Sequence, residues 1–343
     1  MKIHILFNFR EGPWGGGNQF LKGLTHAFHN IGVLTDSIDL ADLILVNGNP
    51  QSCERYSPLL YRLAYQKPTL AFVLRLDGPV SLIRGGDVFF DNLLKVLTGD
   101  LMDGVIYQSH WSKVQNERLF GFHSQRATII HNAADEAIFW RKPPAPGHHP
   151  IRLIATSWSP NMRKGFELYR YLDENLDFSR YRMSFVGNTP FLFRNIRHIP
   201  AVDSAKLAAI LREHDIYITA SQKDPCSNSL IEALACGLPA VALRDGGHPE
   251  LIRQGGDLFD GPENVLPAID RVAANLTSHQ DNLPVHSLAA VAKAYHDFCQ
   301  LIVQKRMERQ ASYMKLFLKS RIWRIRLDLY SFYSRLRYKI ARA

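Results

Sequence analysis

The sequence predicts an α/β protein with two domains, each built on a parallel β-sheet. Three observations lead to this prediction. The length of 343 residues is enough for two α/β domains with full cores. In both halves, short apolar runs enter loops that continue into helices with apolar residues at helical spacing. Between the halves, residues 142–150 (KPPAPGHHP) are too rich in proline and glycine for regular structure.

These observations divide the chain into four parts. We predict a first domain over residues 1–142, a linker over 143–150, a second domain over 151–290, and a helix that crosses back, followed by a basic tail, over 291–343.

In the first domain, apolar runs predict strands at 2–7, 43–46, 69–74, 104–107 and 126–130, with helices from Asn18 and over 87–97 and 111–119. Three glycines, Gly15 to Gly17, separate the first strand from the first helix. Glycine lets the backbone approach a ligand closely, but many tight turns have this composition, so a structural role stays open.

A charged pair, Arg75 and Asp77, follows the strand at 69–74 and therefore lies at the carboxyl edge of the first sheet. The two side chains can contact a substrate or pair with each other, and the sequence favours neither reading. His110 follows the strand at 104–107, where a lone histidine is more often structural.

The second domain contains the most informative stretch of the chain. An apolar run at 216–220 reads as a buried strand, the loop Lys223–Pro225 follows, and Ser227 or Asn228 can cap the next helix. Gly237 ends that helix before the strand 240–243. Further strands are predicted at 151–155 and 182–186, and helices from 204 and near 284–303.

This order places a helix N-terminus at the carboxyl end of a parallel sheet, where free N–H groups and the helix dipole bind phosphate. Glu232 lies about one turn into the helix, within reach of a hydroxyl of the same ligand, and Asp224 precedes it by eight positions on the loop. Phosphate donors combined with carboxylates for hydroxyls suit a nucleotide-sugar better than a bare nucleotide.

The stretch resembles the signature of the family 4 retaining glycosyltransferases, in particular those of bacterial surface-polysaccharide synthesis. The resemblance rests on Asp224 and Glu232, on the sequence ACGLP at 235–239 and on GGHPE at 246–250. It implies the GT-B architecture, in which two Rossmann-like domains face each other. The family motif has glutamate at both ends of the eight-residue step, whereas this chain has Asp224 at the first.

The resemblance also implies roles for individual residues. Glu232 would hold the ribose hydroxyls, and Asp224 would orient the donor sugar and act electrostatically. The phosphates would be bound by Lys164, by Arg163 and by the backbone N–H groups around Ser227, Asn228 and Ser229. The other residues expected at the donor are Gly16, Gly17 and Gly187, with Arg75 and Asp77 as substrate contacts.

Two positions depart from the family pattern. A family arginine about six positions before the lysine falls on Trp158, and a histidine that meets the transferred sugar falls on Leu74. Arg163 can supply the missing cation or be a solvated surface charge, and we hold both readings. Two cations beside a departing diphosphate would stabilise its developing negative charge. We therefore expect no divalent metal and no cofactor besides the nucleotide-sugar substrate.

The positive charge of the protein is concentrated at its C-terminus. The chain has a formal net charge of +9, and residues 305–343 hold 12 Lys or Arg against Glu308 and Asp328. Apolar residues recur there at helical spacing, at 322, 325, 329, 332, 336 and 340. A basic amphipathic tail suits an anionic membrane surface, although it can also pack on the protein body.

Three features predict a cytoplasmic protein. The four cysteines show no close pairing, the start of the sequence does not read as a signal peptide, and no apolar run approaches ~20 residues. With the tail, we expect it on the inner face of the membrane. The predicted activity is metal-independent, retaining transfer from a nucleotide diphosphate sugar to a hydroxyl of a glycan or lipid-linked acceptor.

Two alternatives remain. A nucleotide-sugar epimerase shares the architecture and would yield an isomerised nucleotide-sugar instead of a glycosylated acceptor. A nucleic-acid-binding protein would use the basic tail, but phosphate contacts need no apolar stripe, so no nucleic-acid partner is expected.

Overall fold

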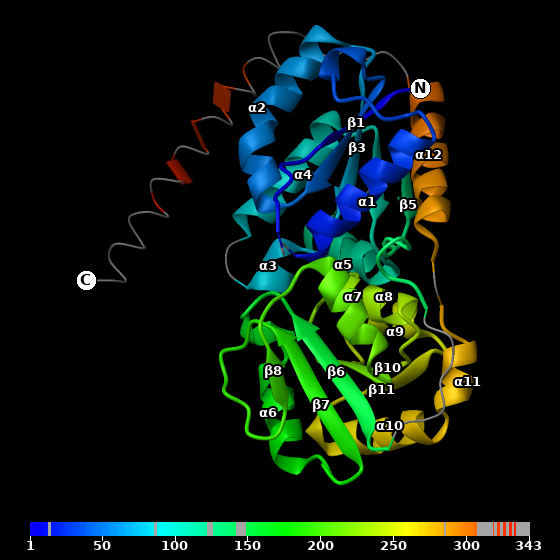
Figure 1. Ribbon diagram of the computed structural model, residues 1–343. Coiled ribbons are helices and arrows are strands. Elements are labelled where there is room, and N and C mark those ends of the chain that lie inside the picture. Colours follow the sequence, from blue (N-terminus) through cyan, green and yellow to red (C-terminus); the bar gives the residue numbers. More distant parts are fainter. Residues whose placement is uncertain are drawn as a thin grey trace.

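The computed structural model describes residues 1–12, 15–85, 88–121, 126–141, 149–284 and 286–306, and eight residues between 318 and 333. Two parallel sheets organise these residues, one above the other in Figure 1. The predicted α/β class is therefore confirmed. Most of the predicted linker and of the predicted tail lies outside the described residues.

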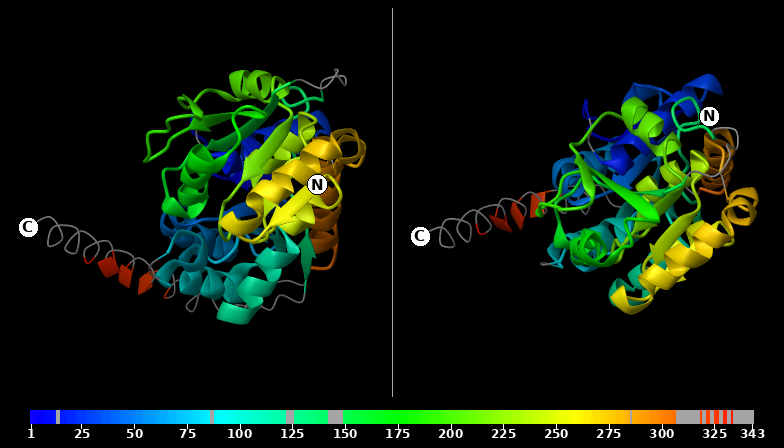
Figure 2. Two further views of the ribbon diagram at one scale, coloured as in Figure 1. Left: turned by 90° about the horizontal axis from the view of Figure 1, so that it is seen from below. Right: turned by 60° about the horizontal axis from the view of Figure 1, so that its bottom comes forward.

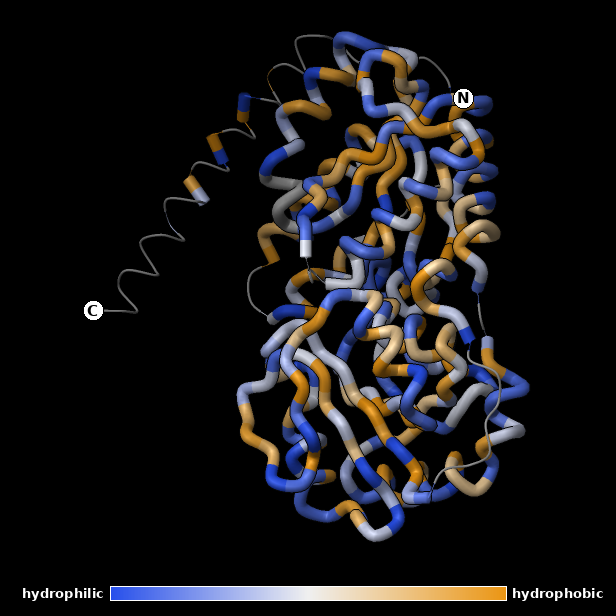
Figure 3. The backbone as a smooth tube through the Cα atoms, in the orientation of Figure 1, coloured by the Kyte–Doolittle hydropathy of each residue, from blue (hydrophilic) through white to orange (hydrophobic). Residues whose placement is uncertain are grey.

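The first sheet has the strand order β1-β2-β3-β4-β5, and all of its pairs are parallel. Its strands are β1 (Ile3–Leu6), β2 (Leu43–Gly48), β3 (Ala71–Leu76), β4 (Gly104–Tyr107) and β5 (Ala127–Ile129). Every residue of β2, β3 and β4 is buried, since helices cover both faces. Figure 3 shows these strands as a hydrophobic centre.

On one face of this sheet lie α2 (Pro50–Gln66) and α4 (Phe89–Leu101), and on the other lie α1 (Gly16–Asn30) and α12 (Leu288–Gln304). The helix α12 comes from the far end of the chain, and its residues Leu288, Tyr295 and Ile302 share a core with Phe20 and Phe28. Two shorter α-helices described in this domain are α3 (Val80–Arg84) and α5 (His110–Phe120).

The second sheet has the order β11-β10-β9-β6-β7-β8 and is also parallel throughout. Its strands are β6 (Ile151–Ser157), β7 (Tyr181–Gly187), β8 (Arg197–Ile199), β9 (Ile216–Thr219), β10 (Ala240–Leu243) and β11 (Gly256–Phe259). One face packs against α6 (Phe166–Asn175) and α10 (Pro262–Ala274). The other packs against α7 (Ser204–Arg212), α8 (Asn228–Ala235) and α9 (His248–Ile252).

The helices α7, α8 and α9 lie at the end of the second domain that faces the first (Figure 1). Seen from below in Figure 2, the second domain lies in front of the first. The short helix α11 (Leu276–Asp281) joins the second domain to the segment leading into α12. Among the described residues, no helix combines the length and apolar composition needed to cross a bilayer.

Every predicted strand is present, with shifts of one or two residues at its ends. The helices α2, α3, α6, α9, α10 and α11 and the strands β8 and β11 were not predicted. Both missed strands are at sheet edges and are only partly buried, so they lack the continuous apolar run of an interior strand. The predicted helix at 87–97 is α4, which begins at Phe89 and continues to Leu101.

Candidate active site

A cleft of about 720 Å³ lies between the two domains, and both contribute to its walls. The first domain lines it with residues that follow β1, β2, β3 and β4. The second lines it with the last residues of β7 and with residues that follow β6, β8 and β9. Loops at the carboxyl ends of both parallel sheets therefore meet there, which is where open α/β sheets bind ligands. All of the predicted site residues line this cleft: Gly16, Gly17, Arg75, Asp77, Arg163, Lys164, Gly187, Asp224, Ser227, Asn228, Ser229 and Glu232.

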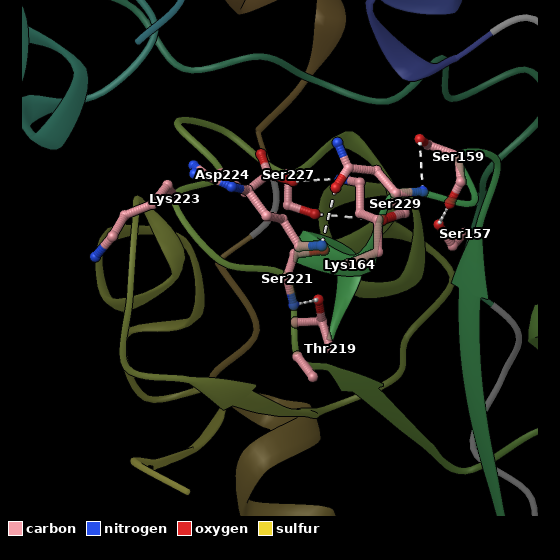
Figure 4. A network of polar contacts seen from close by, with 12 residues as sticks. Ser157, Ser159, Lys164, Thr219, Ser221, Lys223, Asp224, Ser227 and Ser229 are labelled. Carbon is pink, nitrogen blue, oxygen red and sulfur yellow. Dashed lines mark hydrogen bonds and ion pairs between the residues drawn. The ribbon is translucent and has the colours of Figure 1, made fainter. Parts of the chain in front are cut away.

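The helix α8 begins at Asn228 at the wall of the cleft, where the sequence predicts a phosphate site. Ser227 occupies the N-cap position, but its side chain makes no capping hydrogen bond, contrary to the predicted cap. Its hydroxyl instead lies 3.2 Å from that of Ser229 (Figure 4). The first N–H groups of an α-helix have no partner within the helix and, without a cap, are free for an anion.

Lys164 and Asp224 form an ion pair at the cleft, with Nζ 3.0 Å from Oδ2 (Figure 4). Burial favours the neutral acid, but the Lys164 ammonium and His248 favour the carboxylate, and the net effect lowers the pKa of Asp224. Asp224 is therefore ionised at neutral pH. A diphosphate bound at α8 would compete with Asp224 for the lysine.

The position of Asp224 is fixed by a turn of two glycines from a different part of the chain. The Gly247 N–H donates to the Asp224 carbonyl at 2.8 Å. A Cβ atom on Gly246 would lie 2.2 Å from that carbonyl oxygen, and one on Gly247 would lie 2.3 Å from the carbonyl oxygen of Pro225. The predicted GGHPE segment thus serves to seat the loop that carries Asp224.

Glu232 lies one turn into α8 and lines both the main cleft and an adjoining cavity of about 220 Å³. Burial raises the pKa of Glu232 to about 8. The free protein therefore keeps Glu232 largely protonated at neutral pH, and ionisation above pH 8 places an uncompensated charge in the cleft.

This shift predicts a pH-dependent stability difference between the wild type and Glu232→Gln. The folded state holds the proton up to about pH 8, whereas an unfolded glutamate releases it near pH 4.5. Stability from this group is thus fully present below pH 4.5 and is lost as the pH rises through 8. Glutamine resembles the protonated acid at all pH values. We expect Glu232→Gln to have a higher melting temperature than the wild type at pH 9 and a smaller difference at pH 6. Equal differences at both pH values would contradict the assigned pKa.

The three glycines predicted to contact the donor, Gly16, Gly17 and Gly187, differ in their surroundings. A Cβ on Gly16 would lie 2.2 Å from the Cβ of Asn228, so Gly16 lets the start of α1 approach the start of α8. Gly17 has open space around it. Gly187 has φ +122°, and a Cβ there would lie 1.9 Å from the Ser157 carbonyl oxygen. Close packing within the protein therefore explains Gly16 and Gly187, and a donor contact stays a prediction for all three.

Arg163 is directed towards the first domain. Its guanidinium donates to the carbonyl oxygen of Leu82 in α3 and lies beside Gly85. In this conformation Arg163 bridges the domains, and its predicted role at the phosphates remains a prediction. Trp158, which stands at the family arginine position, is 42% exposed at the cleft wall.

The structure describes how Arg75 and Asp77 are arranged. Arg75 is fully buried and donates to the side-chain oxygens of Asn47 at 2.6 Å and Asn132 at 2.8 Å. Its contact with Asp77 is longer, at 3.4 Å. The Arg75 guanidinium is thus held within the first domain, while the Asp77 side chain is 34% exposed at the cleft. Burial raises the pKa of Asp77 although Arg75 opposes the shift.

Sequence reasoning missed several polar residues at this site. Asn132 is fully buried, and its amide donates to Gln108 at 3.1 Å and to Asn228 at 3.0 Å, so it links Arg75 in the first domain to the start of α8 in the second. No pattern in the sequence indicates that this amide meets residues 24 and 96 positions away.

Residues 179–275 match the family model described as glycosyl transferases group 1. This match lies within the second domain and supports glycosyltransferase activity. No curated protein sequence matches the chain. Its fold is similar to that of sucrose-phosphate synthase from Thermosynechococcus elongatus, with TM-score 0.64 and 13% identity, over 89% of this chain and 98% of the other.

Two further solved structures share the fold of this glycosyltransferase. HepE from Anabaena, in complex with UDP, has TM-score 0.62 and 14% identity, over 93% of this chain and 98% of the other. The trehalose-6-phosphate synthase OtsA has TM-score 0.63 and 11% identity, over 90% of this chain and 100% of the other. The GT-B fold is thus confirmed, and the family model confirms the resemblance to glycosyltransferases and the class of enzyme. Retention of configuration and the surface-polysaccharide type stay predictions.

Proposed function

We propose that this glycosyltransferase moves a sugar, with retention of configuration, from a nucleotide diphosphate sugar to a hydroxyl of a glycan or lipid-linked acceptor, as in bacterial surface-polysaccharide synthesis. One observation carries the proposal: the uncapped start of α8, the Lys164 ammonium and the Asp224 carboxylate lie together on one wall of a cleft between two domains. N–H groups and a cation suit the diphosphate, and the carboxylate suits a hydroxyl of the sugar.

The structural relatives support a nucleotide-sugar as donor. HepE has been solved with UDP-glucose and with UDP and glucose, and its fold covers 93% of this chain. In our proposal the diphosphate lies against Ser227, Asn228 and Ser229, Glu232 receives hydrogen bonds from the ribose hydroxyls, and Asp224 receives one from the sugar.

The proposed reaction is a substitution on one face of the sugar. The bond between the anomeric carbon and the phosphate oxygen breaks while the acceptor oxygen bonds to that carbon from the same side. The acceptor's proton passes to the leaving phosphate oxygen. Lys164 stabilises the negative charge that develops on the diphosphate, and Asp224 stabilises the positive charge that develops on the sugar. Asp224 is thus not a covalent nucleophile like that of retaining hydrolases.

The acceptor would enter from the first domain. Asp77 has a partly exposed carboxyl at the opposite wall of the cleft and interacts electrostatically with Asp224. A carboxyl in this place can accept a hydrogen bond from the acceptor hydroxyl and hold it against the anomeric carbon. Positioning of this kind is a large source of rate enhancement.

A thermal-shift panel tests the donor site. Nucleoside diphosphates should raise the melting temperature more than the matching monophosphates, because only the diphosphate reaches both α8 and Lys164. Lys164→Met should reduce that difference, while Lys293→Met, at an exposed position of α12, should leave it unchanged. Equal shifts for mono- and diphosphates in the wild type would contradict the assigned phosphate site.

We further propose that no divalent cation is needed, because Lys164 and the α8 N-terminus neutralise the diphosphate. Turnover is expected to persist at an undiminished rate after dialysis against EDTA, with residual metal measured in the same sample. Loss of turnover that Mg²⁺ or Mn²⁺ restores would show that the diphosphate is neutralised by metal.

We propose that the tail binds an anionic membrane from the cytoplasmic side. The described tail positions are helical, and Leu318, Ile322, Ile325 and Leu329 are exposed at helical spacing. Tyr330 stacks on Phe89 of α4 with ring centroids 4.1 Å apart, which joins the helix to the first domain. An apolar stripe within a strongly basic segment suits an anionic bilayer, where each basic residue contributes ~1 kcal/mol.

Vesicle co-sedimentation tests this proposal. Full-length protein should sediment with anionic vesicles and less with neutral ones, and salt should weaken the association. A chain ending at residue 309 and full-length protein carrying Ile322→Asp and Ile325→Asp should both stay in the supernatant. Equal behaviour of all three proteins with anionic vesicles would overturn the membrane proposal.

A further inference from the structure

A carboxylate of the second domain accepts hydrogen bonds from the N-terminus of a helix in the first domain. Glu250, in α9, accepts hydrogen bonds from the backbone N–H groups of His110 and Trp111, the first two residues of α5, each at 2.7 Å. The Nε2 atom of His131, also in the first domain, lies 3.2 Å from the same carboxylate. These contacts join residues 119 to 140 positions apart in the chain.

The contact between Glu250 and the start of α5 combines hydrogen bonds with a favourable charge–dipole interaction. A helix N-terminus carries unpaired N–H groups and the positive end of the helix dipole, and a carboxylate satisfies both. Burial would raise the pKa of Glu250, but His131 and the two backbone N–H groups favour its ionised form, and the net effect lowers the pKa. Glu250 is 25% exposed, so water screens the interaction only in part.

Glu250 lies three residues after the turn that seats Asp224. That turn, Gly246 and Gly247, rests against the backbone of Asp224 and Pro225. It is also close to the first domain, since a Cβ on Gly247 would lie 3.4 Å from the Cβ of Ser109, the N-cap residue of α5. The start of α5 therefore touches both Glu250 and the turn on which Asp224 depends.

From this arrangement we propose that Glu250 is a positioning residue for Asp224. When the domains close, the first N–H groups of α5 bind the Glu250 carboxylate. This contact holds α9 and the turn before it in place, so that Asp224 faces the cleft. When the domains part, the turn loses this support and Asp224 is less well placed. Glu250 thus couples domain closure to the sugar-binding carboxylate without touching substrate. This inference rests on the proposed glycosyl transfer.

Glu250→Gln tests the coupling with little change in volume. An amide has one oxygen acceptor, so one of the two N–H groups loses its partner and faces an NH₂ group. Loss of a charge-assisted hydrogen bond of ~1.5–3 kcal/mol predicts a roughly ten- to hundredfold fall in kcat. Nucleoside diphosphate affinity should change less than about twofold, because the phosphate site is in the second domain. The matched control is Glu167→Gln, an exposed glutamate that pairs with Arg170 on α6.

Two measurements distinguish a failure of this inference from a failure of the proposed function. Hydrogen–deuterium exchange of residues 222–229 needs no turnover, and it should be faster in Glu250→Gln than in the wild type and in Glu167→Gln. Faster exchange with lower kcat supports the inference. Unchanged exchange, or a lower melting temperature with unchanged kcat, overturns the inference. Glu250 would then only stabilise the contact between the two domains. A wild type that transfers no sugar refutes the proposed function instead, and the exchange result still decides whether Glu250 orders the loop.

Discussion

Gly246→Ala is expected to lower kcat about a hundredfold, while Gly32→Ala leaves kcat unchanged. Both glycines have a left-handed conformation, with φ +63° at Gly246 and +70° at Gly32, so both substitutions carry the same kind of backbone strain. Only at Gly246 does the new Cβ meet another segment, 2.2 Å from the Asp224 carbonyl oxygen. Relief of that overlap requires a shift of the Asp224 loop of about 1 Å, and such a displacement of a reacting group costs roughly a hundredfold in rate.

The comparison of the two variants separates strain from displacement. Their melting temperatures report the shared strain, and steady-state kinetics with saturating donor report the position of Asp224. A kcat of Gly246→Ala equal to that of Gly32→Ala would show that the turn does not control the Asp224 carboxylate.

Asp224→Asn is expected to lower kcat roughly ten- to hundredfold and to preserve or strengthen nucleoside diphosphate binding. The amide keeps the size of the side chain but removes the charge, and a charge-assisted hydrogen bond is worth ~1.5–3 kcal/mol. The ion pair with Lys164, 3.0 Å long, is lost, so the lysine becomes fully available to the diphosphate. Kinetics and isothermal titration calorimetry measure the two effects separately.

The matched control for this prediction is Asp260→Asn, because Asp260 pairs with Arg244 in an exposed position. Asp224→Glu is a companion that introduces the family's residue. It is expected to lower activity as well, since the Asp224 side chain is only 13% exposed and the fixed loop leaves little room for a longer one. Wild-type kinetics in both Asp224 variants would remove Asp224 from the active site.

The sequence predicts the centre of each domain because interior strands of a parallel sheet are continuous apolar runs. The strands at 104–107 and 240–243 are predicted to the residue. The strand–loop–helix unit around Asp224 is predictable for the same reason, since its spacing alone places a helix N-terminus beside the loop. Edge strands such as β8 and β11 are short and half exposed, so they resemble loops in the sequence.

Features that depend on the packing of one domain on the other could not be predicted. The sequence gives the charge of Arg163 but not its direction, and the structure directs it to Leu82 in the other domain. Glu250 belongs to the recognised motif, yet nothing local to it indicates that α5 is its partner. Arg75 was predicted at the edge of the sheet, whereas its burial follows from Asn47 in β2, Phe20 in α1 and Asn132 in the loop after β5.

The most direct test of the proposed function follows the transferred sugar itself. The full-length enzyme is incubated with the nucleotide-sugar whose nucleoside diphosphate gives the largest thermal shift, with and without glycan or lipid-linked acceptors. NMR then identifies the products. We predict one nucleoside diphosphate released per glycosylated acceptor, with the anomeric configuration of the donor retained. An inverted glycoside would contradict the same-face mechanism, and an isomerised nucleotide-sugar formed without acceptor would identify an epimerase instead.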